Sequence, residues 1–376
     1  MKSGKSPGID IIANEMIIPL VEQYPDLILK LFNSILQNIW ISKEWLISII
    51  FPIYKKGAKD DPNNYRGIAL MSCIGKLFLT IINNRLYKFT MEKNILSSSQ
   101  LGFVKGNRTS DPHIILNNMV QKYCHKKKKK LYGCFVDFSK AFDSVPRDIL
   151  LNKLKSCGIN GKIYEIIKTL YCEDFACVKI GNNCSEPFKT NIGVRQGCVL
   201  SPLLFNIFLS DIQEKFDKCV DNVKLDTEEI SCLIWADDIL IISESKNGLQ
   251  SKLNELQLYC KENKLAVNID KTKAMIFSKT GRSWKENFTY NNVIIENVKT
   301  YKYLGFVVSQ SGGIKAGLDD LRIRGLKALI KIRRALGTLF HYNINNTIHI
   351  FNSMVKPILL YCSDFWGCLK PPKTTL

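Results

Sequence analysis

The spacing of apolar residues predicts alternating helices and strands along most of the chain. Helical spacing covers residues 15–40, 72–90, 109–124, 148–156, 161–171, 202–216, 247–263 and 318–340. Short apolar runs typical of strands cover 49–54, 131–136, 178–180, 187–192, 265–269, 274–277 and 301–308. Helices come first, strands mixed with helices follow, and helices end the chain. This order predicts an α+β fold, with a sheet in the middle third of the chain and helices on one face of it.

Two helix starts carry local signals. Ser72 precedes the helical pattern of 72–90 and can cap it through its hydroxyl. Ser201-Pro202 reads as an N-cap followed by the first helical residue of 202–216.

Two adjacent carboxylates interrupt the most apolar part of the chain. Residues 233–242 read Leu-Ile-Trp-Ala-Asp-Asp-Ile-Leu-Ile-Ile, with Asp237 and Asp238 between two runs that should be buried strands. A tight turn would hold both charges against an apolar sheet. Because unpaired buried charge is very costly, the pair needs cations. The pattern predicts a divalent-metal site.

A third carboxylate, Asp137, ends the apolar run Phe135-Val136. Alone it reads as a helix N-cap. Together with Asp237 and Asp238 it offers what two-metal phosphoryl transfer needs, which is carboxylates that converge from separate strands. Mg²⁺ suits such a site because it accepts few protein carboxylates and completes its shell with phosphate and water.

Composition agrees with a nucleic-acid partner without proving one. The 376 residues are 46% hydrophobic and 23% charged, which is enough for a core. The net charge is 53 − 34 = +19, which favours a polyanionic partner. The alternative is compositional bias, because the chain is rich in Lys, Asn and Ile. The lysine run 126–130 reads as a nuclear address, a phosphate contact or a solvated loop.

Cysteine usage and hydropathy exclude several classes of protein. The 13 cysteines form no CxxC pair, and the four histidines lie away from paired cysteines, so a zinc site is not expected. No apolar run approaches the ~20 residues of a membrane span, and the N-terminus lacks the apolar part of a signal peptide. We expect reduced thiols in an intracellular protein, nuclear or cytoplasmic, with no membrane partner.

Short blocks in a fixed order carry a family resemblance. They are Lys5–Asp10, Phe51–Gly57, Asn64–Ile68, Ser99–Phe103, Asp137–Phe142, Gly193–Pro202, Ala236–Asp238, Asn268–Thr272 and Tyr303–Gly305. In this order they resemble the motifs of the reverse transcriptase of LINE-type (non-LTR) retrotransposons, over nearly the whole chain. Each block alone is weak, but the series is specific.

The resemblance implies an RNA-directed DNA polymerase with a right-hand architecture, in which an antiparallel palm sheet carries the aspartates. It places the fingers with an N-terminal extension at 1–127, the palm at 128–144 and 191–312, a fingers insertion at 145–190 and a partial thumb at 313–376. The primer 3′-hydroxyl would attack a dNTP with two Mg²⁺ ions, or Mn²⁺ as a substitute. The implied partners are RNA template, DNA primer and dNTPs.

The resemblance also assigns catalytic roles. Asp137 and Asp237 would ligate the metals, with Asp238 assisting as a third metal-site residue. Lys271 would protonate the leaving pyrophosphate or hold its charge. The competing interpretation makes Lys271 a surface residue on a turn, with Lys273 as a rival.

Residues implied to bind the dNTP are Lys55, Lys56, Arg66, Phe142, Gln196 and Gly197. The three basic residues would reach over the triphosphate, although one lysine is expected to be simply solvated. Phe142 would lie under the sugar and exclude a 2′-hydroxyl, or it is an ordinary core residue. Gln196 and Gly197 would contact the nucleotide, or form a plain loop before a helix.

The resemblance implies a primer grip at Tyr303, Leu304 and Gly305, where a tight hairpin would brace the primer end, although core packing explains Leu304 equally well. The basic helix 318–340 resembles a thumb helix that follows the duplex backbone, or it is an ordinary solvated helix. Its expected apolar face carries Leu318, Leu321, Leu326, Leu329, Leu336 and Phe340.

Trp235 departs from the family, which usually has Phe or Tyr at this position, so bulk near the primer end could impair extension. An alternative reading is therefore an inactive, truncated relic that only binds nucleic acid. An RNA-dependent RNA polymerase is a third reading, disfavoured by Phe142. We also expect the chain to be a fragment of a larger open reading frame whose endonuclease domain is missing.

Overall fold

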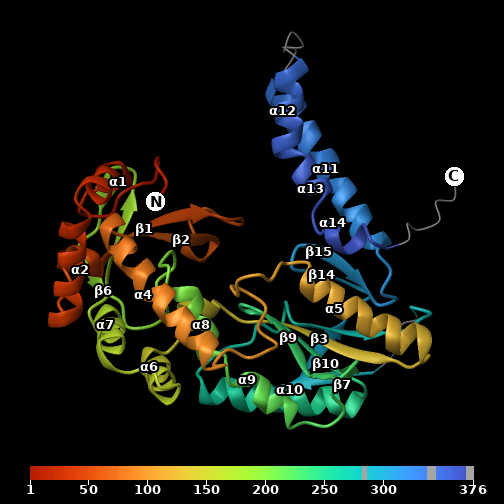
Figure 1. The fold of residues 1–376 in the computed structure, drawn as a ribbon. Helices are drawn as coiled ribbons and strands as arrows, with labels where there is room; N and C mark the ends of the chain where they lie inside the picture. Colours follow the sequence, from red (N-terminus) through yellow and green to blue (C-terminus); the bar gives the residue numbers. More distant parts are fainter. Residues whose placement is uncertain (282–285, 337–343, 370–376) are drawn as a thin grey trace. The chain divides into compact units, whose positions relative to one another are not determined.

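The computed structural model describes residues 1–281, 286–336 and 344–369, which divide into two compact units. Unit 1 comprises residues 1–98, 139–211 and 260–266, and unit 2 comprises 99–138, 212–259 and 267–376. Each unit has its own sheet (Figure 1). Within the described ranges, no helix is both long enough and apolar enough to cross a membrane.

Unit 1 is built on a five-stranded sheet in the order β2-β1-β4-β5, with β6 also paired to β4. Its strands are β1 Ile47–Tyr54, β2 Tyr65–Leu70, β4 Phe175–Ile180, β5 Asn183–Cys184 and β6 Phe188–Lys189. β1 and β2 form an antiparallel hairpin, while β4 runs parallel to β1. The strand expected at 187–192 is confirmed only for the two residues of β6.

The helices of unit 1 are α1 Asn14–Gln23, α2 Pro25–Asn38, α3 Lys43–Leu46, α4 Cys73–Glu92, α6 Arg147–Ser156, α7 Gly161–Cys172 and α8 Ser201–Phe208. Ser72 caps α4 as predicted, because its hydroxyl accepts a hydrogen bond from Gly75 N at 3.1 Å. Phe78 in α4 contacts the rings of Phe32 and Trp45, which ties α2 and α3 to the same core.

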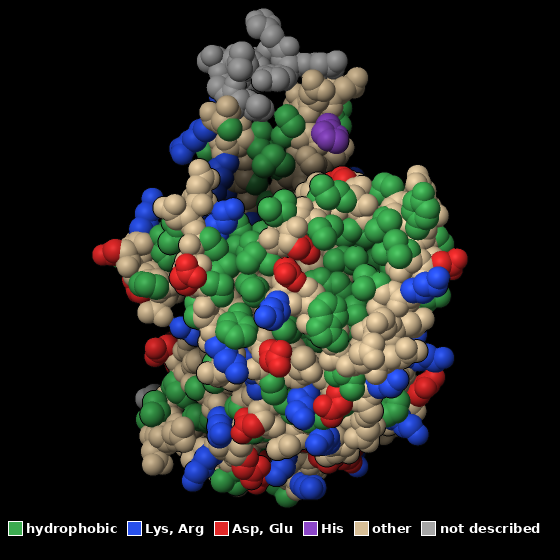
Figure 2. Space-filling view, turned by 90° about the vertical axis from the view of Figure 1, so that its left-hand side faces the viewer, with side chains coloured by type: hydrophobic (Ala, Val, Ile, Leu, Met, Phe, Trp, Pro, Cys, Tyr) green, Lys and Arg blue, Asp and Glu red, His purple; other side chains and the backbone are tan. Residues whose placement is uncertain are grey.

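Helix α2 buries one apolar stripe and exposes another. Phe32 and Ile35 are in the core, whereas Leu27 and Leu29 are exposed. Figure 2 shows many apolar side chains on the face of unit 1 that carries α1 and α2. The exposed stripe is more apolar than the solvent-facing side of a helix usually is.

A buried charge cluster fixes the loop before α8. The Asp174 carboxylate accepts a hydrogen bond from Arg147 Nη2 at 2.7 Å and forms an ion pair with Arg195, whose Nε lies 2.7 Å from Asp174 Oδ1. Arg195 also donates to Leu46 O at 2.7 Å, and Arg147 donates to Gly193 O at 3.0 Å. Because every charge in this cluster has an opposite partner and further hydrogen bonds, the cluster is tolerated in the core and holds the loop to the sheet.

Unit 2 is built on a six-stranded sheet in the order β12-β13-β11-β3-β10-β9. Its strands are β3 Leu131–Asp137, β9 Cys232–Trp235, β10 Asp238–Ser243, β11 Lys273–Phe277, β12 Phe288–Tyr290 and β13 Val293–Asn297. The central strand β3 is antiparallel to both β10 and β11. β9 pairs antiparallel with β10, which confirms the predicted hairpin over 233–242. A separate small hairpin joins β7 Val223–Leu225 to β8 Glu228–Ile230.

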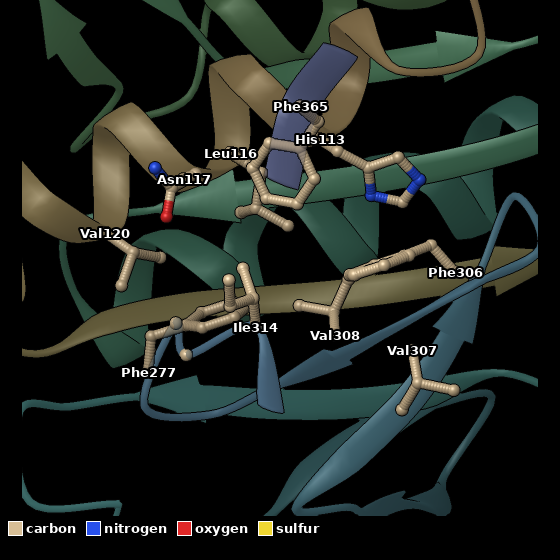
Figure 3. A pocket seen from close by; sticks show the side chains of 12 residues that line it. His113, Leu116, Asn117, Val120, Phe277, Phe306, Val307, Val308, Ile314 and Phe365 are labelled. Atoms are coloured by element: carbon tan, nitrogen blue, oxygen red, sulfur yellow. The ribbon is translucent and has the colours of Figure 1, made fainter. Parts of the chain in front are cut away.

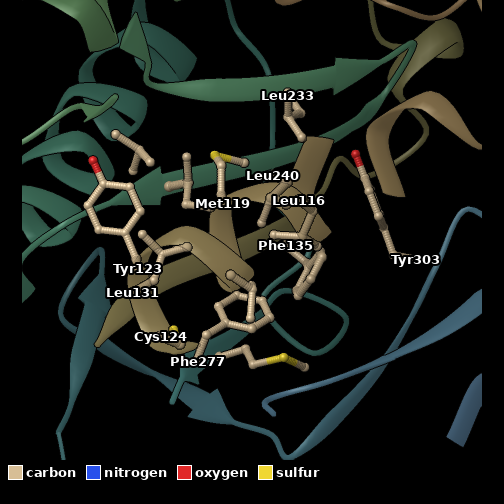
Figure 4. Packing of buried hydrophobic residues seen from close by; sticks show 14 residues of the cluster. Leu116, Met119, Tyr123, Cys124, Leu131, Phe135, Leu233, Leu240, Phe277 and Tyr303 are labelled. Atoms are coloured by element: carbon tan, nitrogen blue, oxygen red, sulfur yellow. The ribbon is translucent and has the colours of Figure 1, made fainter. Parts of the chain in front are cut away.

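Helices cover both faces of this sheet (Figure 1), so the expectation of helices on one face was wrong. On one face lie α5 Asp111–Val120 and the π-helix Gln121–Lys126, where one helix over 109–124 was expected. α10 Lys246–Glu262 covers the other face with Leu249, Leu253, Leu256 and Tyr259, all fully buried as their spacing predicts. The core under α5 contains Leu116, Met119, Tyr123, Cys124, Leu131, Phe135, Leu233, Leu240, Phe277 and Tyr303 (Figure 4). Burying each large apolar side chain contributes about 1.5–3 kcal/mol.

A buried histidine connects α5 to a second hairpin, β14 Thr300–Tyr303 and β15 Phe306–Ser309. The His113 ring lies 5.6 Å from the Phe306 ring and stacks on Phe365 at 5.8 Å (Figure 3). It also lies 5.3 Å from the Tyr303 ring. Neither ring nitrogen has a hydrogen-bond partner among the described residues. Burial lowers the pKa of His113 to about 4, so this side chain is a neutral packing element at physiological pH.

Helices α11 Lys315–Leu336, α12 Ile344–Met354, α13 Lys356–Leu359 and α14 Ser363–Trp366 end unit 2. The predicted apolar face of 318–340 is only partly confirmed. Leu321 is buried, whereas Leu326 and Leu329 are exposed. Phe340 and the side chain of Leu336 lie outside the described residues.

Four predictions about single segments were wrong. Residues 202–216 form two helices, α8 and α9 Ile212–Asp217, and Ser201 is inside the first, with Leu200 at its N-cap. The Ser201 hydroxyl instead donates to Arg195 O at 2.7 Å. Residues 265–269 form no strand beyond one bridge at Val267, because the chain turns directly afterwards. Residues 301–308 form the β14–β15 hairpin rather than one strand.

Candidate active site

The two adjacent aspartates lie at a two-residue turn between β9 and β10. Trp235 pairs with Asp238, so Ala236 and Asp237 form the turn. Ala236 has φ +56°, a left-handed conformation that costs an alanine about 1 kcal/mol or more. Such strain persists only where the surroundings hold the turn firmly.

The register of the sheet brings Asp137 to the same place. Asp137 ends β3 directly opposite Asp238 at the start of β10. Opposed residues of antiparallel strands point to the same face with close Cα atoms. The alternative of a helix cap for Asp137 is excluded, because the next helix is a 3-10 turn at Ala141–Asp143 with Lys140 before it. Sequence-distant carboxylates therefore share one edge of the sheet, as predicted.

These carboxylates repel one another. The pKa of Asp238 is raised to about 6, first by burial and then by the charges of Asp237 and Asp137. Lys271 opposes this effect, since its Nζ lies 3.2 Å from Asp137 Oδ2. Its rival Lys273 is paired with Glu296 at 2.7 Å instead. Of the two lysines, Lys271 is the one beside the carboxylates.

The donor chemistry fits a hard divalent cation. Oxygen ligands with negative charge are what Mg²⁺ prefers, and after burial the charges of Asp237 and Asp137 are what raise the pKa of Asp238. Within the described ranges, however, no group of three Cys, His, Asp or Glu side chains has the geometry to hold a metal ion. The structure thus shows neighbouring carboxylates of suitable chemistry rather than a ready-made ligand cage.

A segment that the sequence assigned no role supports the turn. Gln100 Oε1 accepts from Gly102 N at 2.8 Å and from Ala236 N at 3.3 Å. Leu101 N donates to Ile234 O at 2.8 Å, extending the pairing beside β9. Gly102 packs so closely that a Cβ there would lie 2.5 Å from Ala236 N. The block Ser99–Phe103 signalled this segment, but its contact with the turn depends on tertiary structure.

A second segment supports Asp137. Thr272 Oγ1 accepts a hydrogen bond from Asp137 N at 3.3 Å, and Asn268 N donates to Asp137 O at 2.8 Å. Thr272 is buried, so its hydroxyl is fixed. Residues 268–272 therefore hold the backbone of Asp137 while they present Lys271 to its carboxylate.

The residues predicted to bind a nucleotide all belong to unit 1. Lys55 and Lys56 follow β1 and are exposed, and Arg66 is exposed on β2. Lys55 N donates to Asn64 O at 2.8 Å, which continues the β1–β2 pairing into the turn. The three cations thus project from one hairpin end, free to meet an anion.

The loop before α8 carries the other predicted nucleotide contacts. Gln196 Nε2 donates to Asp143 Oδ1, and Gly197 has φ +98° with a Cβ position 2.8 Å from Ala69 O, so only glycine fits. A cavity of about 230 Å³ lies beside the loop. Phe142 is half-buried, with its ring stacked on Phe205 at 4.5 Å.

The predicted grip residues differ in exposure. Tyr303 is a core residue, 2% exposed, and its ring lies 5.2 Å from the Phe135 ring. Burial and, secondly, the charge of Asp238 raise its pKa. Leu304 and Gly305 form the two-residue turn, since Tyr303 pairs with Phe306. The turn, which is half-buried, is therefore the part of this block that is not in the core.

Comparison with known proteins gives one family. A family model described as reverse transcriptase (RNA-dependent DNA polymerase) matches residues 53–308. The probable RNA-directed DNA polymerase from transposon BS of Drosophila melanogaster is 29% identical, over 96% of this chain and 40% of its own length. The RNA-directed DNA polymerase from mobile element jockey of Drosophila funebris is 26% identical, over 98% and 40%. A retrovirus-related Pol polyprotein from the type-1 retrotransposable element R2 of Nasonia vitripennis is 26% identical, over 85% and 32%. The chain thus spans about 40% of the first two relatives, and the resemblance to non-LTR retrotransposon enzymes is confirmed.

Solved structures agree on the fold. Telomerase from Candida tropicalis without its C-terminal domain matches with a TM-score of 0.51 at 17% identity, covering 76% of this chain and 58% of that chain. The same telomerase with a telomeric RNA fragment matches at 0.52 and 14% identity, covering 90% and 57%. The predicted right-hand, α+β polymerase fold with an antiparallel sheet is confirmed.

Asp238→Asn should remove the most disfavoured charge of the site. Its pKa is about 6 in the folded chain against an ordinary 3.8, so the folded state binds more protons between these values. The free energy of unfolding of the wild type therefore falls as pH rises through this window. In EDTA, we expect the variant to be more stable by about 2 kcal/mol above pH ~6 and equally stable near pH ~4, by urea unfolding. Asp226→Asn, in an exposed turn, should show no such pH-dependent difference. A variant less stable than wild type at every pH would contradict this electrostatic account.

Gly102→Ala should displace the aspartate turn. The added methyl would lie 2.5 Å from Ala236 N and 2.9 Å from Trp235 C, and neither backbone atom can yield without moving the turn. We expect a loss of about 1–3 kcal/mol in urea unfolding and less thermal stabilisation by added Mn²⁺. Gly313→Ala, whose methyl meets only Ser311 Oγ at 3.4 Å, is the matched control. Equal behaviour of the two variants would show that Gly102 does not brace the turn.

Proposed function

Because this chain belongs to the reverse transcriptase (RNA-dependent DNA polymerase) family, we propose that it is the polymerase part of a retrotransposon protein and copies RNA into DNA. The observation that carries the proposal is the meeting of Asp137 with the Asp237–Asp238 turn at one edge of the unit 2 sheet. Its substrates are an RNA template, a DNA primer and dNTPs.

The reaction is nucleotidyl transfer. The primer 3′-hydroxyl attacks the α-phosphorus of the dNTP in line, the P–O bond to the β-phosphate breaks, and pyrophosphate leaves. Divalent metal use is general to this family. Two Mg²⁺ ions, or Mn²⁺ as a substitute, neutralise the reacting phosphates and acidify the hydroxyl when bound. Asp137 and Asp237 are the ligands that we propose, with Asp238 assisting.

Lys271 has a separate role in this scheme. Its ammonium group lies at the Asp137 carboxylate, so it is held near the place where the leaving group develops charge. It gives a proton to pyrophosphate or holds its charge, which a flexible, strongly hydrated cation does well.

Residues of unit 1 bind the incoming nucleotide. Lys55, Lys56 and Arg66 neutralise the triphosphate, and Arg66 offers a planar fork for two phosphate oxygens. Gln196, steadied by Asp143, and Gly197 approach the nucleotide through an amide and bare backbone. Phe142 presents the part of its ring that is not covered by Phe205 to the sugar and excludes a 2′-hydroxyl.

The division into fingers (1–127 and 145–190), palm (128–144 and 191–312) and thumb (313–376) remains part of the proposal. Residues 99–127 pack within unit 2, with the sheet that carries the aspartates. In this scheme Tyr303, Leu304 and Gly305 brace the primer end, and basic residues of α11 follow the duplex backbone, which gives affinity without base readout.

Asp237→Asn should abolish synthesis while the chain stays folded. Asparagine keeps the shape of the turn and removes a charged ligand, so incorporation of dTTP on a poly(rA)·oligo(dT) template with Mg²⁺ should fall at least about 1,000-fold. Primer–template binding, measured by fluorescence anisotropy, should be unchanged. Binding without incorporation in the wild type would support an inactive relic instead. Incorporation of rNTPs alone on RNA would support an RNA-dependent RNA polymerase.

Phe142→Val should admit ribonucleotides. The smaller side chain leaves room for a 2′-hydroxyl, so the preference for dNTP over rNTP in single-nucleotide extension should fall about 100-fold, or about 2.7 kcal/mol. Phe208→Leu removes packing from a fully buried ring of the same helix that carries Phe205, without touching the gate, and should keep the preference. Unchanged discrimination in Phe142→Val would remove the steric-gate assignment.

A further inference from the structure

The Leu304–Gly305 turn is clamped by side chains from later in the chain. The hairpin ladder ends at the pair Tyr303 and Phe306, and both turn residues have positive φ, +41° and +84°. A two-residue turn of this kind leaves its own carbonyl groups outside the ladder. On an exposed hairpin, water molecules would donate hydrogen bonds to these carbonyl groups. Here side chains of the protein donate them instead.

Two donors meet the two carbonyls. Tyr361 Oη donates to Leu304 O at 2.6 Å, and Arg324 Nη2 donates to Gly305 O at 2.9 Å. Arg324 lies in α11, and Tyr361 lies between α13 and α14. The turn is therefore held from two separate elements of the helical C-terminal region of unit 2.

Both donors are themselves fixed in orientation. Arg324 Nε lies 2.9 Å from Asp320 Oδ2, and the same oxygen lies 3.5 Å from Nζ of Lys302 in β14. Trp366 Nε1 donates to the main-chain O of Tyr361 at 2.8 Å, which holds the backbone from which the tyrosine side chain extends. The Asp320 carboxylate thus joins α11 to the hairpin strand as well as to the arginine. An orientation fixed in this way is what a positioning contact requires.

Stability alone does not explain this arrangement. Leu304 and Gly305 are half-buried, so water could satisfy their carbonyls, and a hydrogen bond at such a site adds only about 1 kcal/mol net. The hairpin is already anchored by Tyr303 and Phe306, both 2% exposed. The clamp acts on the part of the hairpin that the core does not fix.

We propose that Tyr361 and Arg324 are positioning residues for the primer 3′ end, because they fix the backbone of the turn that touches it. This inference rests on the proposed primer grip at residues 303–305. It gives the helices after residue 312 a second role besides electrostatic contact with the duplex. They set the position of the turn at which the primer terminates.

The test uses steady-state extension of oligo(dT) on poly(rA) by the full chain. Tyr361→Phe removes one hydroxyl and keeps the ring. We expect KM for primer–template to rise about fivefold, the size of one lost hydrogen bond, with KM for dTTP unchanged and the melting temperature lowered by no more than about 3 °C. Arg324→Gln should act in the same direction, and Arg324→Lys should restore part of the loss. Tyr24→Phe, at an exposed tyrosine of unit 1, is the control for loss of a hydroxyl.

A second readout separates this inference from the primer grip itself. A primer with 4-thiothymidine at its 3′ end is annealed to the RNA template and irradiated on the protein. Crosslinks at residues 303–305 in the wild type that weaken in Tyr361→Phe support both ideas. Crosslinks that persist in the variant, with an unchanged KM, overturn the clamp and leave the grip standing. Absence of crosslinks there in the wild type overturns the grip and the clamp together. A large fall in melting temperature with equal rises in both KM values would make Tyr361 merely structural.

Discussion

Repulsion between carboxylates at one sheet edge is the constraint on which the rest of the site depends. Asp137 and Asp238 are opposed across β3 and β10, and Asp237 is next to them in the turn. A sheet that is apolar on both faces cannot disperse this charge, and the raised pKa of Asp238 shows the cost. Lys271 relieves it in part, at Asp137. The negative charge that remains attracts cations, which in this family are divalent metals.

Because the charges push apart, the surroundings must hold them in place. Gln100 and the close approach of Gly102 fix one side, where the turn lies. Thr272 and Asn268 fix the other side, at the backbone of Asp137. Both braces act on main-chain atoms, so they hold position without competing for the carboxylate oxygens. The same principle returns at the Leu304–Gly305 turn, where the donors again meet main-chain carbonyls.

The sequence predicted what depends on local patterns. The run 233–242 predicted both strands and the turn, because two short apolar segments on either side of two charged residues favour a buried hairpin. Ser72 correctly predicted the start of a helix. The sequence could not predict the strand register that places Asp137 opposite Asp238. These residues are a hundred positions apart, and only the order of the motifs connected them. The sequence also missed the break after α8, where continuous apolar residues conceal the end of a helix. The block Ser99–Phe103 marked the segment that contains Gln100, but it could not give the contact with the turn, because a buried amide acquires its partners only when distant segments meet.

Ala236 shows how firmly the turn is held. Glycine or asparagine is the usual choice at positive φ, and alanine pays about 1 kcal/mol or more there. Glycine at position 236 would relax the strain, but it would also allow a wider range of backbone angles in the turn. The direction of the Asp237 side chain would then vary with those angles. An alanine kept in the left-handed region by Gln100 and by strand pairing has one conformation available. The strained Ala236 therefore favours one direction for the Asp237 side chain, which a site built from mutually repelling ligands requires.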